Sequence, residues 1–399
     1  MSHTREPGGT PTLAATDVRA AGFDSVIMLS PFPWNGPWHT LHYFATQLSR
    51  RMPVVYVEPS PSWDPRVPGF KVGPLLRGRR IVARSDRLCV VTPQRLPLER
   101  FEPLHQASER SYLEVIHDAC ATYGVRRPLC WATYYQGVVR HLQLLEAEHY
   151  VYHCLDYFDH PEEASLAERA DIVFAVSRPL KERQRARNPR VFLVPNGVAM
   201  DWLTPGTVAA PTNDLARRRT LGFVGTLNRN VDFGLLLATA RRFPDATLRI
   251  IGSVVSKLSP AQQNVLETLK SLPNVQMLGF RPPQELFAHI AKYDVCLLPF
   301  LDNEWISHSD PIKFYQYLAL GKPVVTTPVP AALRYRELCY VASSHAAFLA
   351  SIEAALGESD GQWALRKRVA AVHDWKRLAR RAEKLVVMTR RRGRDHARV

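Results

Sequence analysis

The chain alternates short, almost wholly apolar runs with stretches whose apolar residues recur at helical spacing. The apolar runs of the first half lie at 25–30, 53–59, 87–93, 128–133, 149–157, 171–177 and 190–198. Those of the second half lie at 221–227, 247–253, 274–280, 294–300, 323–329 and 339–344. Helical patterns intervene, notably at 39–51, 110–123 and 162–169. Because strands that are apolar on both faces belong to parallel sheets covered by helices, the pattern predicts two doubly wound α/β domains.

The expected boundary between these domains is a stretch rich in Pro, Thr and Ala near residues 200–219. A chain of 399 residues also exceeds what one hydrophobic core usually holds. We divide the chain into a disordered tail (1–20), a first Rossmann-like domain (21–200), a second one (201–375) and a basic C-terminal segment (376–399). Such domains bind ligands at the carboxyl ends of their strands, so the cleft between the two sheets is the expected site.

Composition argues against several classes of protein. The chain is 46% hydrophobic and 22% charged, has no apolar run of 18 residues, and lacks a positively charged start followed by an apolar signal segment. Its six cysteines include no CxxC pair, and most lie in apolar runs, which is typical of buried thiols in a reducing compartment. We therefore expect a cytoplasmic protein without a metal–thiolate site.

The formal net charge of +15 comes from two segments. Residues 66–95 hold eight Lys or Arg and one acidic residue, and residues 376–399 hold ten Lys or Arg and two acidic residues. Because the remainder is neutral, we do not expect a nucleic-acid-binding protein. Near the C-terminus, apolar residues recur at helical spacing among the arginines: Trp375, Leu378, Ala379, Ala382 and Val386. This pattern fits a basic amphipathic helix on an anionic membrane at the inner face of the cell, and equally a packed C-terminal helix whose arginines face solvent.

The segment SDPIKFYQYLALGKPVVTTPVP (309–330) predicts a helix followed by a strand. Asp310 can serve as the N-cap, Pro311 fits the first helical position, and Gly321 ends the helix. Lys313 then lies in the first turn, where backbone amides already give positive potential and a cation is disfavoured. We interpret Lys313 as facing an anion, and a lysine that points into solvent is the alternative.

A second signal for an anion follows the run at 221–227. The sequence FVGTLNRNVDF places Gly225 and Thr226 at a strand end and Arg229 before a helix, where helix amides and Arg229 can hold an anion. In a parallel sheet this loop and the helix that carries Lys313 emerge at the same edge, so both can reach one diphosphate. No G-x-G-x-x-G follows the first strand, and no P-loop motif occurs in the chain.

These segments resemble the donor domain of nucleotide-sugar glycosyltransferases with the GT-B architecture, in the large retaining group of bacterial polysaccharide pathways. The resemblance spans roughly residues 149–345 and rests on the order of its motifs. The motifs are YHCLDYFDHP, DIVFAVSRPL, VPNGV, FVGTL with DFGLL, RIIGS, NVQMLGF, ELFAHIAKYDVCLLPF and PIKFYQYLALGKPVVTT. The resemblance implies two Rossmann-like domains facing across a cleft, a nucleotide-diphosphate sugar as donor substrate, no cofactor, and a glycan or lipid-linked acceptor.

The resemblance also implies which residues bind the donor. They are Gly225, Thr226, Arg229, Gly252, His308, Lys313 and Gln316. His308 and Gln316 stand where the family often carries two glutamates, one contacting the donor sugar and one the ribose. Gln316 keeps the capacity to bind ribose hydroxyls, whereas His308 changes both charge and shape. Arg229 is the nearest substitute for a lysine that the family often places after its glycine loop.

Sugar transfer needs charge stabilisation on the leaving diphosphate and an aligned acceptor hydroxyl. No Asp-x-Asp sequence is present to hold a divalent metal, so we expect metal-independent transfer in which Arg229 and Lys313 stabilise the leaving group. Asp156, at a strand end, is the candidate base or hydrogen-bond acceptor of the first domain, with Asp159 and His153 behind it. A helix cap is the alternative role for Asp156.

Three residues after the first strand, Trp34, Trp38 and His39, lie where acceptor contacts are expected. An aromatic staple for the next helix is the alternative, and for these residues the favoured one.

The sequence thus predicts a hexosyltransferase-type enzyme of cell-surface polysaccharide biosynthesis. Two other classes stay open: a sugar-nucleotide epimerase on the same fold, which would turn over its nucleotide sugar without an acceptor, and a non-catalytic scaffold, which the replaced glutamates would suit.

Overall fold

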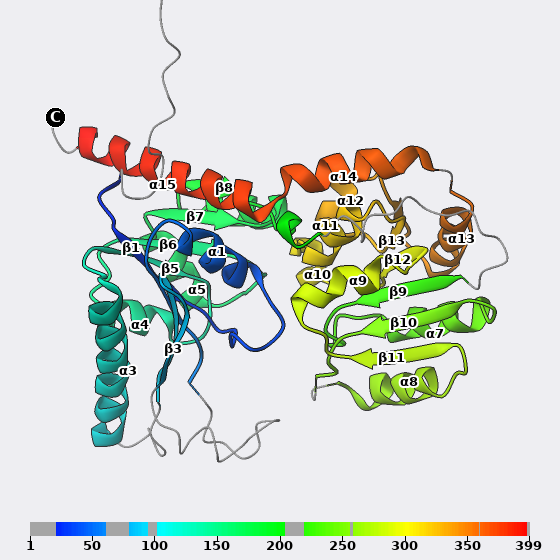
Figure 1. The fold of residues 1–399 in the computed structure, drawn as a ribbon, viewed down its shortest axis with the longest axis horizontal. Helices are drawn as coiled ribbons and strands as arrows, with labels where there is room; N and C mark the ends of the chain where they lie inside the picture. The colour runs from blue at the N-terminus through cyan, green and yellow to red at the C-terminus, as the bar shows by residue number, and fades with distance from the viewer. Residues whose placement is uncertain are drawn as a thin grey trace, which may run out of the picture.

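The computed structural model of the protein describes residues 21–60, 80–94, 102–203, 219–255, 258–358 and 360–396. These residues form two α/β domains next to each other, each with a sheet flanked by helices (Figure 1). The predicted tail at 1–20, residues 66–79 and 95 of the first basic segment, and residues 204–218 of the expected boundary lie outside the described residues. Among the described helices, none has the length and apolar character needed to span a bilayer.

The described part of the first domain contains an eight-stranded sheet in the order β3-β4-β2-β1-β5-β6-β7-β8. The strands are β1 (Ser25–Leu29), β2 (Val54–Val57), β3 (Arg80–Ser85), β4 (Leu88–Thr92), β5 (Pro128–Ala132), β6 (Tyr150–Cys154), β7 (Ile172–Ala175) and β8 (Val191–Leu193). Neighbours pair in parallel except β3 and β4, which pair antiparallel. The strands at the centre of the sheet are buried along their length, which is why they appear in the sequence as continuous apolar runs. All seven predicted strands are confirmed, and the exposed edge strand β3 is an addition to them.

The helices of the first domain are α1 (Thr40–Ser49), α3 (Glu102–Tyr123), α4 (Val138–Leu144), α5 (Pro161–Arg169) and α6 (Arg178–Arg185). Helices α1, α3 and α5 confirm the three helical patterns of the sequence. Local chemistry sets their boundaries, as at α6, where the Ser177 Oγ accepts a hydrogen bond from the Leu180 amide at 3.3 Å and Pro179 follows in the first turn.

The second domain contains a six-stranded parallel sheet in the order β11-β10-β9-β12-β13-β14. Its strands are β9 (Thr220–Val224), β10 (Thr247–Ile251), β11 (Val275–Gly279), β12 (Val295–Leu298), β13 (Val324–Thr326) and β14 (Tyr340–Val341). Its α-helices are α7 (Phe233–Arg242), α8 (Pro260–Lys270), α9 (Leu286–Ile290), α10 (Glu304–His308), α11 (Ile312–Ala319), α12 (Pro330–Arg334), α13 (His345–Leu356) and α14 (Trp363–Val372). Three short 3-10 helices are η2 (Met200–Trp202), η4 (Pro283–Glu285) and η5 (Asp360–Gln362). All six strands predicted for the second half are confirmed.

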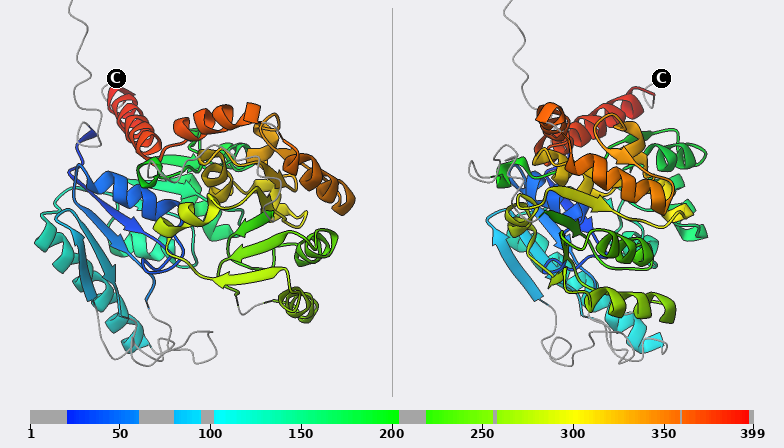
Figure 2. Two further views of the ribbon diagram at one scale, coloured as in Figure 1. Left: turned by 45° about the vertical axis from the view of Figure 1, so that its right-hand side comes forward. Right: turned by 90° about the vertical axis from the view of Figure 1, so that its right-hand side faces the viewer.

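The C-terminal helix α15 (Trp375–His396) lies on the first domain, whereas α14 just before it lies on the second (Figures 1 and 2). All five apolar positions that the sequence singled out are buried in the first-domain core: Trp375, Leu378, Ala379, Ala382 and Val386. Burying a large apolar side chain contributes about 1.5–3 kcal/mol, so α15 is an integral part of that core. The basic residues between them are exposed: Lys376, Arg377, Arg380, Arg381 and Lys384. The segment at 376–399, predicted as separate, therefore contains a packed helix with a cationic outer face.

Candidate active site

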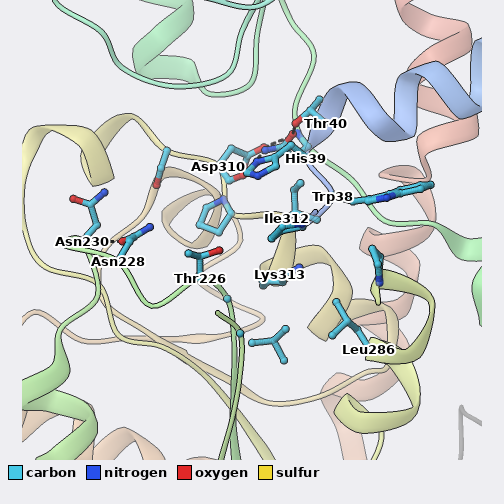
Figure 3. A pocket seen from close by; sticks show the side chains of 18 of the residues that line it. Trp38, His39, Thr40, Thr226, Asn228, Asn230, Leu286, Asp310, Ile312 and Lys313 are labelled. Atoms are coloured by element: carbon cyan, nitrogen blue, oxygen red, sulfur yellow. Dashed lines mark hydrogen bonds between the residues drawn. The ribbon is translucent and has the colours of Figure 1, made fainter. Parts of the chain in front are cut away.

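A cavity of about 270 Å³ lies between the two domains, at the carboxyl ends of the strands of both sheets (Figure 3). The first domain contributes the loop after β1, the start of α1 and the segment after β6. The second domain contributes the loops after β9, β10 and β11, helix α10 and the start of α11. The cavity therefore lies where the doubly wound architecture predicts a ligand.

Glycines after two adjacent strands form part of the second-domain face of the cavity. Gly225 and Thr226 follow β9, and Gly252 follows β10; all three line the cavity, as predicted. Gly252 has φ of 151°, and a Cβ there would lie 1.8 Å from the carbonyl oxygen of Gly225. This close approach of two loops is possible only without a side chain, and it leaves backbone groups rather than side chains to face a ligand.

The start of helix α11 forms the adjacent part of this face. The helix begins at Ile312, with Pro311 at the N-cap and without a capping side chain. Ile312 and Lys313 both line the cavity (Figure 3), and within the described residues their backbone amides have no hydrogen-bond partner, whereas the Phe314 amide donates to the Pro311 carbonyl at 3.0 Å. Free amides and a lysine thus meet at one position, which favours an anion.

Lys313 is half-buried, and within the described residues no carboxylate forms an ion pair with it. Burial lowers the pKa of Lys313 to about 8, because the charged ammonium loses hydration and gains no counter-charge. A positively charged group that lacks a protein partner at the edge of a cavity is suited to bind an anionic ligand.

Asp310 is not the N-cap that the sequence predicted. Its carboxylate accepts hydrogen bonds from the Asn196 amide of the first domain at 2.6 Å and from the Tyr315 hydroxyl at 2.8 Å. These two donors take the oxygens that a cap would offer to α11. Helix α11 ends at Ala319, shortly before the predicted stop at Gly321.

Arg229 does not line the cavity, although the sequence predicted it at the site. The Asn228 side chain accepts a hydrogen bond from the Asn230 amide at 2.9 Å, and this turn directs Asn228 and Asn230 to the cavity (Figure 3) and leaves Arg229 exposed. A different cation, Arg281, lines the cavity from the loop after β11. Its position after a strand was the only sequence signal that would have identified it.

His308 and Gln316, at the positions of the two family glutamates, do not line the cavity. The His308 ring lies 4.7 Å from the Tyr157 ring of the first domain, and its Nδ1 is 2.8 Å from the Glu304 carbonyl oxygen. Gln316 is buried one turn after Lys313, and its Oε1 has no hydrogen-bond partner among the described residues. His308 therefore contributes to the contact between the domains, whereas Gln316 retains an unused acceptor.

The first-domain face is built from aromatic and imidazole side chains. His42 fixes the loop after β1: its Nδ1 accepts from the His39 amide at 3.0 Å, so its Nε2 carries the proton and donates to the Pro33 carbonyl at 3.2 Å. Trp38 and His39 are thereby presented to the cavity. Trp34 is buried, 5.4 Å from the His42 ring, and so has the packing role that the sequence favoured.

His39 is neutral at physiological pH. Burial, assisted by the nearby charge of Lys313, lowers its pKa to about 3. Its ring stacks on Phe32 with centroids 3.7 Å apart. A neutral, fixed imidazole can act as donor or acceptor of one hydrogen bond to a ligand.

Asp156 is the carboxylate of the first-domain face. It lines the cavity after β6, and burial raises its pKa to about 6. It does not cap α5, because His160 is the N-cap there and accepts from the Glu162 amide at 3.2 Å. The two residues predicted behind it lie elsewhere: Asp159 is exposed and pairs with Arg183 at 3.0 Å, and His153 is buried in the first-domain core.

A bound metal ion needs several side chains that can act as ligands. The part of the chain that the structure describes has no group of three or more His, Cys, Asp or Glu residues arranged to hold a metal ion. The polar groups at the cavity are instead backbone amides, asparagines, hydroxyl groups, the imidazole of His39, the cations Lys313 and Arg281, and the carboxyl groups of Asp156 and Asp310.

Comparison with known proteins agrees with this geometry. Residues 218–358 match the family model of the glycosyl transferases group 1. The chain is 26% identical over 234 residues to the Bacillus subtilis (strain 168) protein named for teichuronic acid biosynthesis, the glycosyltransferase TuaH, covering 56% of this chain. The alignment spans 58% of the length of that relative.

Solved structures share the fold across both domains. Sucrose-phosphate synthase from Thermosynechococcus elongatus superposes with a TM-score of 0.67 at 17% identity, covering 91% of this chain and 98% of that one. Anabaena HepE, in complex with UDP and glucose, gives a TM-score of 0.60 at 16% identity, covering 90% and 98%. The resemblance and the fold predicted from the sequence are thereby confirmed: the chain has the GT-B fold, and its residues 218–358 match the family model of the glycosyl transferases group 1.

Proposed function

We propose that the protein transfers a sugar from a nucleotide-diphosphate sugar to a glycan or lipid-linked acceptor of a cell-surface polysaccharide. The observation that carries this proposal is the meeting of Lys313, the free amides of α11 and the glycine loops after β9 and β10 at one interdomain cavity. TuaH, named for teichuronic acid biosynthesis, supports the polysaccharide context, and the HepE complex with UDP and glucose supports the donor class.

In this proposal the donor diphosphate lies at the start of α11. Its charge is stabilised by Lys313 and by the first-turn amides, and Gly252 lets the ligand approach the backbone. Because these groups supply the positive potential that a metal would otherwise give, the transfer is proposed to be metal-independent, without a further cofactor.

The nucleotide base is proposed to lie against the apolar lining of the second domain. Ile251, Phe280, Pro283 and Leu286 line the cavity together with Arg281, and the loops that carry them follow neighbouring strands. Flat apolar surface with one hydrogen-bonding cation is the usual environment of a base in a small-molecule site.

Transfer is proposed to proceed with Asp156 as the base of the acceptor side. The acceptor oxygen forms a bond to the anomeric carbon, the bond from that carbon to the diphosphate breaks with its electron pair, and the acceptor proton passes to Asp156. With a pKa of about 6, Asp156 is ionised at neutral pH and still basic enough to accept a proton. The neutral His39 across the face is placed to orient the acceptor hydroxyl.

A thermal-shift panel with UDP, GDP, ADP and TDP tests the donor class, because a ligand that binds only the folded state raises its stability by about 2.7 kcal/mol at a hundredfold excess over Kd. We expect one nucleotide to raise the melting temperature, and the corresponding sugar nucleotide to be consumed only when an acceptor is present. Consumption without an acceptor would indicate an epimerase, and no binding by any nucleotide would indicate a scaffold.

We also propose that the protein binds the cytoplasmic face of an anionic membrane through the outer face of α15. Five cations are exposed there, and each is worth about 1 kcal/mol near an anionic surface. Since α15 is also part of the core, charge changes rather than deletion are the appropriate test. Replacing Lys376, Arg377, Arg380, Arg381 and Lys384 by Gln should abolish flotation with anionic vesicles and leave the melting temperature unchanged; unchanged flotation would contradict the proposal.

A further inference from the structure

We propose that Asp310 is a positioning residue that couples closure of the two domains to the placement of Lys313. This inference rests on the proposed function. The Asp310 carboxylate lies between the domains, 6% exposed, and one of its oxygens accepts from the Asn196 amide at 2.6 Å. The Asn196 side-chain amide in turn donates to the Asp310 carbonyl oxygen. The two residues thus clamp each other across the domain boundary.

The clamp is fixed on its first-domain side by helix α1. The Thr40 hydroxyl, at the first residue of α1, donates to the Asn196 side-chain oxygen at 2.6 Å. Thr40 directly follows His39, which lines the cavity and belongs to the loop that His42 fixes. The first-domain face of the cavity and the clamp are therefore both held at the start of helix α1.

The clamp sits where the chain passes between the domains. Gly197 packs against the junction of α14 and α15, where a Cβ would lie 2.1 Å from the His373 carbonyl oxygen. Val198 bonds the same junction twice, through its amide to the His373 carbonyl at 3.0 Å and through its carbonyl to the Trp375 amide at 3.1 Å. Asn196 is therefore directly followed by residues that pack on the point where the chain passes from α14 to α15.

On its second-domain side the clamp ends at the residues that hold the anion. Asp310 directly precedes Pro311, Ile312 and Lys313, and no side chain caps α11. The first turn of α11 is instead held by the contacts of Asp310 to Asn196 and to Tyr315. Lys313 and the start of α11 are consequently next to a hydrogen bond that joins the two domains.

The buried Asp310 carboxylate does not stabilise the fold at neutral pH. Burial raises the pKa of Asp310 to about 7, although its hydrogen bonds to Asn196 and Tyr315 and the charge of Arg334 act in the opposite direction. His373, which stacks on Tyr315, is neutral, since burial lowers its pKa to about 4. A folded-state pKa above the unfolded value means that this group favours folding at acid pH and loses that contribution as pH rises toward 7. Stability at neutral pH therefore does not explain an aspartate at this position, whereas a functional role does.

The test compares Asp310→Ala, the conservative Asp310→Asn and the matched control Tyr315→Phe, which removes only the bond inside the second domain. For Asp310→Ala we expect kcat to fall about tenfold to a hundredfold, because misplaced catalytic groups cost that much, while nucleotide affinity falls by less than it does in Lys313→Ala, because the lysine is displaced and not removed. Asp310→Asn, which keeps an acceptor oxygen, should recover part of kcat, and Tyr315→Phe should lose little. Unchanged kcat in Asp310→Ala, or a loss of nucleotide affinity as large as that of Lys313→Ala, would overturn the proposal.

Hydrogen exchange provides a readout that does not depend on activity. The Asn196 amide should exchange faster in Asp310→Ala than in the parent and in Tyr315→Phe, because it has lost its acceptor. If the parent neither binds a nucleotide nor transfers a sugar, the proposed function fails, and the exchange comparison still decides whether the clamp exists. Equal exchange in all variants would show that it does not.

Discussion

The two faces of the cleft differ in the chemical groups that they offer to a ligand. On the second-domain face, the part around the start of α11 consists largely of backbone: glycines at 225 and 252 and the amides of Ile312 and Lys313, with the Lys313 ammonium as the nearby cation. The first-domain face consists of side chains, among them Trp38, a neutral His39 and the carboxylate of Asp156. Backbone amides suit an anion of fixed geometry such as a diphosphate, whereas aromatic and titratable side chains suit the choice and activation of a sugar hydroxyl.

This difference agrees with which part of the chain the family model matches. The match covers residues 218–358, the domain whose face depends on backbone geometry. A backbone site requires glycines at specific places, which leaves a recognisable pattern in sequence. A face made of side chains can change with each acceptor while its fold stays the same. The first domain is therefore where specificity for the acceptor is expected to reside.

The largest effect on nucleotide binding by the second-domain face is expected from Gly252→Ala. A Cβ at this position would lie 1.8 Å from the Gly225 carbonyl oxygen, so the loops after β9 and β10 must separate. We expect nucleotide binding and transfer to be lost, with a lower melting temperature because φ of 151° is also strained for alanine. Calorimetric titration beside a thermal unfolding curve measures both effects, and full binding by the variant would contradict the backbone character of this face.

The next effect concerns the charge on this face. Lys313→Ala should weaken nucleotide-diphosphate binding by roughly ten to 150-fold, since a charge-assisted contact of about 1.5–3 kcal/mol is lost. The free protein should be as stable as the parent or slightly more so, because a half-buried cation leaves a first helical turn. Titration of each variant with the nucleotide from the thermal-shift panel measures the affinity.

Arg229→Ala is the matched control for Lys313→Ala. Arg229 is a cation of the same domain, exposed and outside the cavity lining. Its removal should leave affinity within about twofold of the parent, as is usual for an exposed residue without structural contacts. Equal losses in the two variants would mean that the diphosphate lies nearer the loop after β9 than the start of α11.

Much of this fold could be predicted because its strands are buried on both faces. Runs such as β7 and β12 are apolar throughout and lie between helices, which is a strong local signal. The strand β3 gives no such signal, since its residues are exposed and include Arg80 and Arg84. Its antiparallel pairing with β4 depends on the partner strand rather than on its own sequence.

The candidate site could be predicted only in part, for a similar reason. Lys313 and Asp156 were found because position after a strand or in a first helical turn is a local property. Asp310 has the pattern of an N-cap, but its partner is an amide 114 positions away in sequence, which no local rule can reveal. Arg229 and Arg281 differ in where their loops direct them, and that is decided by tertiary contacts.

The first-domain face is tested by Asp156→Asn. The amide keeps the shape of the carboxylate but cannot take a proton, so we expect kcat to fall about tenfold to a hundredfold with nucleotide affinity unchanged. In the parent, kcat should rise with pH through about 6 as the carboxylate ionises, and this rise should be absent from the residual activity of the variant. A variant that keeps both kcat and the pH profile would remove Asp156 from the chemistry.

A smaller expected effect, at most about tenfold, separates charge from shape at Lys313. Because its pKa in the free protein is about 8, the lysine loses its proton as pH rises from 7 to 9, and at pH 9 only about a tenth remains charged. Nucleotide affinity of the parent should fall over this range by up to about tenfold, less if the diphosphate itself raises the lysine pKa. Lys313→Arg keeps its charge throughout and experiences the same ionisation of nucleotide and protein elsewhere, so the fall should be absent from it. Calorimetric titration at pH 7, 8 and 9 compares the two, and parallel curves would show that the charge at position 313 does not hold the donor.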